Sequence, residues 1–157
     1  MTPDKVHEIL KAKHAQAVSA FDPNPKHPSI KIAPEFWRVV AKTLRDDCGL
    51  DYLVSLTAVD RAAELEAIYT LEVMDGARCP IHVRVLVPRD NPLIATVEDI
   101  WRTADWHERE AWDLMGITFV GHHNLVRILC AEDWEGHPLR KDYKSPDTYH
   151  GIKNNVT

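Results

Sequence analysis

Histidine, carboxylate and arginine side chains are concentrated in residues 105–143, among three of the five tryptophans of the chain. His107 and Glu108 begin like the metalloprotease helix motif His-Glu-x-x-His, in which two histidines one turn apart hold zinc. Position 111 is alanine, so the second zinc ligand is missing. The four histidines of this stretch follow no other recognised ligand spacing, and we expect no metal site.

Other catalytic patterns are incomplete as well. The three cysteines form no Cys-x-x-Cys pair for zinc or an iron–sulfur cluster, and the glycines form no phosphate-binding loop or dinucleotide fingerprint. Glu108 and Glu110 lie two residues apart and point to different helix faces, which makes them a poor acid–base pair. From the residues alone, the default for both is a solvated helix surface. We predict no catalytic residue and no cofactor in this chain.

The carboxylates and arginines need a helix to position them. Asp105 has the spacing of an N-cap, followed three residues later by a capping-box glutamate. The predicted helix covers residues 106–115, and Gly116 suits the left-handed position that ends it. Arg109 and Asp113 are four residues apart on this helix, so we expect them to form an ion pair.

Beyond this helix the chain mixes aromatic, apolar and charged residues. A Gly-His-Pro sequence at 136–138 breaks regular structure before Arg140, Lys141, Asp142 and Tyr143. Tryptophan, tyrosine and arginine are enriched at the centres of protein–protein contacts. The composition therefore favours a contact with another protein over a solvated loop.

The whole stretch resembles the signature of the thirty-kilodalton subunit, also called the C subunit, of NADH–quinone oxidoreductase (respiratory complex I). His123 and Val126 depart from it, because the family commonly has proline and a basic residue at these positions. The residues that carry the resemblance are Glu108-Arg109-Glu110, Asp113-Leu114-Met115-Gly116-Ile117, Phe119, Gly121-His122, Leu125, Arg127-Ile128-Leu129, Asp133-Trp134, Gly136 and Pro138-Leu139-Arg140-Lys141-Asp142-Tyr143.

The resemblance implies a non-redox structural subunit in the hydrophilic arm of a proton-translocating enzyme, peripheral to the cytoplasmic side of the cell membrane. It implies docking on the large quinone-site subunit, near the iron–sulfur subunits. NADH, FMN, iron–sulfur clusters and quinone are then expected in partner subunits. The predicted partner interface comprises Glu108, Arg109, Glu110, Asp113, His122, Arg127, Trp134, Arg140, Lys141, Asp142 and Tyr143.

Two alternative functions stay open. Membrane-bound hydrogenases and related complexes carry similar subunits, and the sequence does not identify the electron donor or acceptor. A stand-alone enzyme could use the histidine- and carboxylate-rich stretch, although the lack of a complete catalytic spacing disfavours it.

Composition limits the remaining possibilities. A length of 157 residues fits one domain, and a net charge of −5 argues against nucleic-acid binding. No run of eighteen apolar residues predicts a membrane span, and the N-terminus has no signal-peptide core. The odd, widely spaced cysteines suggest reduced thiols.

Helices are expected from Pro3, from Pro34 to near Gly49, and from Thr96 to Thr103. In the second helix we expect Phe36, Val39, Val40 and Leu44 on the buried side. Strands are expected at 29–33, 52–59, 65–73, 81–87 and 117–120, with a turn at Asp75-Gly76.

Short connections between the strands at 52–59, 65–73 and 81–87 require antiparallel pairing. We therefore predict an α+β fold of two layers, a mainly antiparallel sheet covered by helices on one side. Residues 1–143 form the single domain, including the 105–143 signature. Residues 144–157 form an extended C-terminal tail, which the resemblance lays on a partner.

Overall fold

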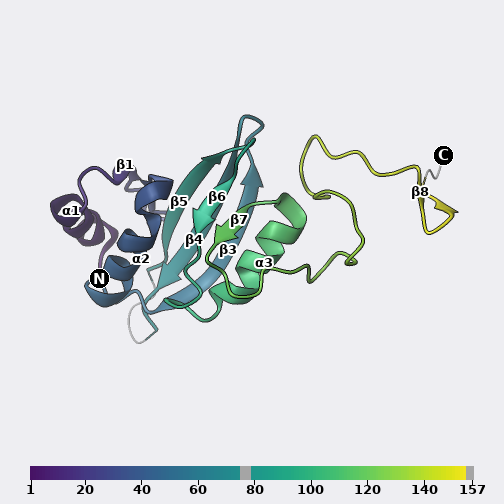
Figure 1. The fold of residues 1–157 in the computed structure, drawn as a ribbon. Helices are drawn as coiled ribbons and strands as arrows, with labels where there is room; N and C mark the ends of the chain where they lie inside the picture. Colours follow the sequence, from purple (N-terminus) through teal and green to yellow (C-terminus); the bar gives the residue numbers. More distant parts are fainter. Residues whose placement is uncertain (75–78, 155–157) are drawn as a thin grey trace.

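A five-stranded sheet occupies the centre of the computed structural model, which describes residues 1–74 and 79–154 (Figure 1). The predicted turn at Asp75-Gly76 lies outside the described residues. In sheet order the strands are β1 (Val18–Asp22), β2 (Ser29–Ile32), β5 (Ile81–Pro88), β4 (Glu64–Glu72) and β3 (Tyr52–Asp60).

The pairs β3–β4 and β4–β5 are antiparallel, as their short connections require. β1 and β2 form a further antiparallel pair, and β1 was not expected from the sequence. β2 pairs with β5 in parallel, and a helix and the sheet strands β3 and β4 separate the two in sequence.

The two faces of the sheet differ in chemistry because successive side chains point to opposite sides. Leu65 and Tyr69 of β4 and Val83 of β5 are fully buried on the apolar face. On the opposite face Glu66 of β4 accepts hydrogen bonds from the Nε atoms of Arg61 and Arg84, at 2.7 and 2.5 Å. The fold is therefore two-layered α+β, with the helices packed on the apolar face.

The helices are α1 (Pro3–Lys13), the 3₁₀ turn η1 (Pro34–Phe36), α2 (Trp37–Asp46) and α3 (Ala104–Met115). Trp37 is fully buried and its ring lies 4.2 Å from that of Tyr69. The expectation that Val39 faces the core is wrong, since its side chain is 48% exposed. α2 buries Trp37, Val40, Ala41 and Leu44, and Phe36 packs against the core partly buried.

The helix predicted from Thr96 to Thr103 is also wrong. This segment consists of turns, with Val97, Ile100 and Trp101 buried. The Trp101 indole N–H donates to the Leu50 carbonyl at 2.9 Å. Contacts with distant residues therefore override the local capping signal.

A small parallel pair joins β6 (Leu93–Ala95), which was not expected, to β7 (Thr118–Val120), which was. After β7 the chain passes along α3 and extends beyond it to a hairpin of β8 (Thr148–Tyr149) and β9 (Ile152–Lys153), within the predicted tail (Figure 1). None of the helices in the described part of the chain has the length and apolarity to cross a bilayer.

Candidate functional site

The candidate site consists of α3 and of the segment that follows β7. Residues 121–143 of this segment are called the arm. The C-terminal end of α3 is as predicted, because Gly116 adopts a left-handed φ of 73°. The predicted N-cap is wrong: Thr103 occupies the N-cap position, without a side-chain cap, and Asp105 lies in the first turn. The helix starts earlier because Ala104 is fully buried and belongs to the core.

Glu108 does not serve a capping box and does not lie on a solvated surface. Its side chain is fully buried and accepts hydrogen bonds from the Thr96 hydroxyl and the Val97 backbone N–H. Burial raises the pKa of Glu108 to about 7, against the effect of these two hydrogen bonds. Glu108 therefore ties α3 to the preceding segment, and its side chain is not available to a partner.

The predicted ion pair of Arg109 with Asp113 is also wrong. The Arg109 guanidinium lies 5.1 Å from the Trp106 ring centre, and its Nε donates to the Val126 carbonyl at 3.2 Å. Asp113 is fully buried and instead accepts from Nη1 of Arg127 at 2.6 Å. Arg109 belongs to α3 and donates to the arm, whereas Arg127 belongs to the arm and donates to α3.

The second carboxylate oxygen of Asp113 gathers three consecutive backbone N–H groups of the arm. Ile128, Leu129 and Cys130 donate to Oδ2 at 3.0, 2.8 and 2.9 Å. Burial alone would raise the pKa of Asp113, but these bonds and Arg127 hold it well below the usual range of an aspartate. Asp113 therefore stays ionised and anchors the arm on α3.

Arg127 extends this anchor to the far part of the arm. Its Nη2 donates to the carbonyls of Trp134 at 2.7 Å and Gly136 at 3.0 Å. The guanidinium also lies 5.6 Å from the centre of the Trp112 ring. One side chain thus connects three points of the arm to the helix.

A second anchor involves Arg140 and the end of α3. Arg140 Nε donates to the Met115 carbonyl at 2.7 Å, and Nη2 donates to the Gly116 carbonyl at 3.3 Å. A Cβ atom at Gly116 would overlap the His137 ring and would lie 2.5 Å from Arg140 Nη2. Glycine at 116 therefore permits both the left-handed turn and the close approach of the arm.

Asp60 at the end of β3 provides a third anchor. It accepts the Lys141 backbone N–H at 2.8 Å and the Arg89 guanidinium at 2.6 Å. Arg89 also lies 3.6 Å from Asp142. These contacts, with burial opposing them, lower the pKa of Asp60.

The structure brings the predicted interface residues together around α3 but divides them into two groups. Glu110, Lys141 and Asp142 are exposed, and Trp134 and Tyr143 are half-buried. The other six use their polar atoms within the chain: Glu108, Arg109, Asp113, His122, Arg127 and Arg140. Five of these six position the arm, and Glu108 holds α3 to the segment before it.

The predicted interface residues do not include several exposed apolar side chains around the anchors. Trp106, Leu129 and Leu139 are 63, 62 and 59% exposed, and Val126 is 45% exposed. The signal was their place in the sequence, because each lies within two residues of an anchor or of another predicted interface residue. Leu139 also lines an open groove of about 190 Å³ between α3 and β3.

Residues 30–149 match the family of the respiratory-chain NADH dehydrogenase 30 Kd subunit, and the chain belongs to that family.

Two relatives are named as the C subunit of NADH-quinone oxidoreductase. The protein of Chloroherpeton thalassium is 40% identical over 154 residues, covering 96% of this chain and 64% of the relative. The protein of Chlorobium phaeobacteroides is 43% identical over 152 residues, covering 94% of this chain and 92% of the relative. The chain thus spans slightly less than two thirds of the length of the first relative and most of the length of the second.

Solved structures agree on the fold. A trypsin-resistant fragment of Nqo5 superposes with a TM-score of 0.65 at 25% identity, over 77% of this chain and 99% of the fragment. A chain of an archaeal membrane-bound sulfane sulfur reductase superposes with a TM-score of 0.76 at 22% identity. The superposition covers 90% of this chain and 84% of the reductase chain. The second likeness concerns the fold alone.

Proposed function

We propose that this chain is a structural, non-redox subunit in the hydrophilic arm of a proton-translocating NADH–quinone oxidoreductase. It docks on the large quinone-site subunit, near the iron–sulfur subunits, on the cytoplasmic side of the membrane. Family membership supports the complex. The exposed apolar residues of the arm support the docking surface.

The observation that carries the docking proposal is the pairing of polar atoms inside the arm. Arg127 and Arg140 donate to backbone carbonyls of their own chain, so their charges hold the arm in shape. Val126, Leu129 and Leu139 remain exposed as large apolar side chains of the arm. They lie in sequence among exposed charged residues such as Glu132, Asp133 and Lys141. Clustered apolar side chains beside charged ones are typical of a contact surface.

The mechanism of such a subunit is positional. Electron transfer and quinone access depend on fixed distances in the partner subunits. The rigid arm of this chain, residues 121–143, helps to maintain these distances. NADH, FMN, the iron–sulfur clusters and quinone belong to those partners in this proposal. The purified chain is therefore expected to be colourless and to bind no flavin and no iron.

A related membrane-bound complex is the second candidate, because the sulfane sulfur reductase chain shares the fold. The two candidates differ in the partners that co-purify. Isolation of the native complex with its NADH-oxidising subunits would favour the first, and isolation without them would favour the second.

The docking surface can be tested with Leu129→Asp, since Leu129 is 62% exposed and its replacement disturbs little of the core. Met74→Asp is the control, because Met74 is 65% exposed but follows β4, outside the arm. We expect both variants of the lone chain to melt near the wild-type temperature. Only Leu129→Asp should deplete the assembled complex on native gels and its quinone reductase activity.

Normal assembly with Leu129→Asp would reject the arm as the docking surface. Cell fractionation tests the location separately: the native chain should sediment with membranes through its partners. A chain found only in the soluble fraction, outside any large complex, would favour the stand-alone enzyme.

A further inference from the structure

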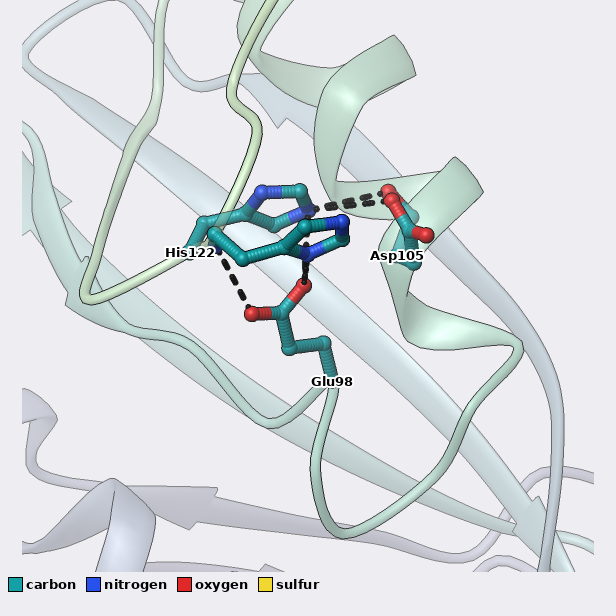
Figure 2. A group of neighbouring side chains, drawn as sticks. Glu98, Asp105 and His122 are labelled. Carbon is teal, nitrogen blue, oxygen red and sulfur yellow. Dashed lines mark hydrogen bonds and ion pairs between the residues drawn. The ribbon is translucent and has the colours of Figure 1, made fainter.

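Two histidines and two carboxylates lie close together where the arm begins. They come from three separate places in the sequence, so no sequence motif indicates the cluster. Glu98 comes from the turn before α3, Asp105 from its first turn, and His122 and His123 from the turn after β7. One potential ligand atom from each residue lies within 4.8 Å of all the others. Figure 2 shows Glu98, Asp105 and His122 pointing toward one another.

The central histidine has no strong hydrogen bond at the nitrogen that faces this cluster. His122 Nε2 lies 3.4 Å from Oε2 of Glu98 and 3.4 Å from Oδ1 of Asp105, and 3.2 Å from the Asp105 carbonyl. The ring is fully buried. One proton at Nε2 would be shared among three acceptors. The Asp105 carbonyl lies at the long end of the hydrogen-bond range and the two carboxylate oxygens lie beyond it.

A buried oxygen of Asp105 also favours a bound ion in this cluster. Its Oδ1 is buried and has no hydrogen-bond partner among the described residues. A buried carboxylate oxygen without a partner costs free energy, and coordination to a bound ion removes that cost. His123 Nδ1 adds a ligand 2.6 Å from Glu98 Oε2.

The types of ligand select the kind of ion. Two carboxylates carry two negative charges, which a divalent cation neutralises while both imidazoles stay uncharged. Imidazole nitrogen together with carboxylate oxygen suits zinc, at about 2.0–2.2 Å from each ligand. Magnesium and calcium prefer oxygen ligands throughout.

We propose that Glu98, Asp105, His122 and His123 bind one Zn²⁺ ion, which clamps the start of the arm to the first turn of α3. An open pocket of about 440 Å³, lined in part by Glu98, Asp105 and His123, gives the ion a path from solvent. The bound ion is structural and adds no redox chemistry, so the chain still carries no electron.

Binding requires a small rearrangement of the cluster. Ligand atoms of a tetrahedral zinc lie roughly 3.3–3.6 Å apart. The more distant atoms of the cluster, which lie within 4.8 Å of one another, must therefore move closer. His123 Nδ1 and Glu98 Oε2, now 2.6 Å apart, must separate. The Asn124 N–H now donates to His122 Nδ1 at 3.1 Å. Zinc at Nε2 places the imidazole proton on Nδ1, so the exposed Asn124 N–H turns to water.

This proposal replaces the expectation of no metal, which rested on spacing along the sequence. Residues 98, 105, 122 and 123 follow no short motif. They meet because β7 pairs with β6 and thereby returns the chain to the segment before α3.

The test is zinc titration of the untagged full chain, by calorimetry and by native mass spectrometry. His123→Ala removes a side chain that is 65% exposed, and Asp105→Asn removes a charge with little change in shape. His27→Ala is the matched control, because His27 is also exposed and its ring lies 5.7 Å from that of a second histidine, His82. Circular dichroism establishes that each variant is folded.

We expect one zinc per chain in the wild type and in His27→Ala, undisturbed by millimolar Mg²⁺. Affinity should fall at least about tenfold in His123→Ala and in Asp105→Asn. Zinc should also raise the melting temperature of the wild type more than that of either variant. Absence of stoichiometric zinc, or an affinity unchanged by either substitution, would overturn the site.

Discussion

The Asp113 anchor makes the sharpest prediction about the arm. Asp113→Ala removes the acceptor of one Arg127 bond and of three backbone N–H bonds. It also leaves Arg127, whose side chain is only 13% exposed, without its counter-ion. Breaking a buried ion pair from one side costs about 3–5 kcal/mol.

This cost should fall on the arm and not on the core. The sheet and its apolar face do not depend on Asp113, whereas the Ile128, Leu129 and Cys130 amides do. A loss of about 3 kcal/mol corresponds to roughly a hundredfold change in the population of the open arm. We therefore expect these amides to exchange their hydrogens at least about a hundredfold faster in the variant.

The measurement is residue-resolved hydrogen exchange by NMR on the lone chain. Asp133→Ala is the control, because Asp133 is an exposed carboxylate of the same arm that pairs with Tyr149 and His150. It should leave the three amides protected, and the amides of β4 should be unchanged in both variants. Retained protection at residues 128–130 in Asp113→Ala would refute the anchoring role, and simultaneous loss in β4 would place Asp113 in the core.

Three further predictions concern α3. The folded-state pKa of Glu108, about 7, lies above its ordinary 4.5, so its contribution to stability is present below pH 4.5 and is lost as pH rises through 7. Glu108→Gln imitates the protonated form. Between pH 5 and pH 8 its free energy of unfolding, measured in urea, should rise by about 3 kcal/mol relative to that of the wild type. Parallel curves of stability against pH for the two proteins would contradict this. Arg140→Ala should lower the free energy of unfolding by about 1–2 kcal/mol, because it removes two hydrogen bonds to the end of α3. The control Lys141→Ala should change it by no more than about 0.5 kcal/mol. Equal melting temperatures for the two variants would instead favour a docking role for Arg140. Gly116→Ala should cost more than about 1 kcal/mol in thermal unfolding, and a wild-type melting temperature would show that the arm yields easily.

Local patterns predicted the elements whose stability is local. The alternation in residues 65–73 predicted β4, and Gly116 predicted the end of α3. The helix expected from Thr96 failed because Trp101 and Glu108 bond to residues that a local pattern does not include. β1 and β6 were missed because their short lengths give no clear alternation.

The candidate site shows the same division. The resemblance selected the right region, and its residues do gather around α3. It did not separate the anchors from the exposed surface, because helical spacing paired Asp113 with Arg109 whereas the folded arm supplies Arg127. Only the fold of the arm decides which arginine reaches that carboxylate.

The parallel pairing of β2 with β5 has a consequence for the order of folding. Ser29 lies beside His82, so this contact closes a loop of about fifty residues. The β3–β4 and β4–β5 hairpins close much shorter loops and should form first. The β1–β2 ribbon then has no place to attach until β5 is in the sheet. Substitutions in β2 should accordingly speed unfolding with little change in the folding rate, whereas those in β4 should slow folding.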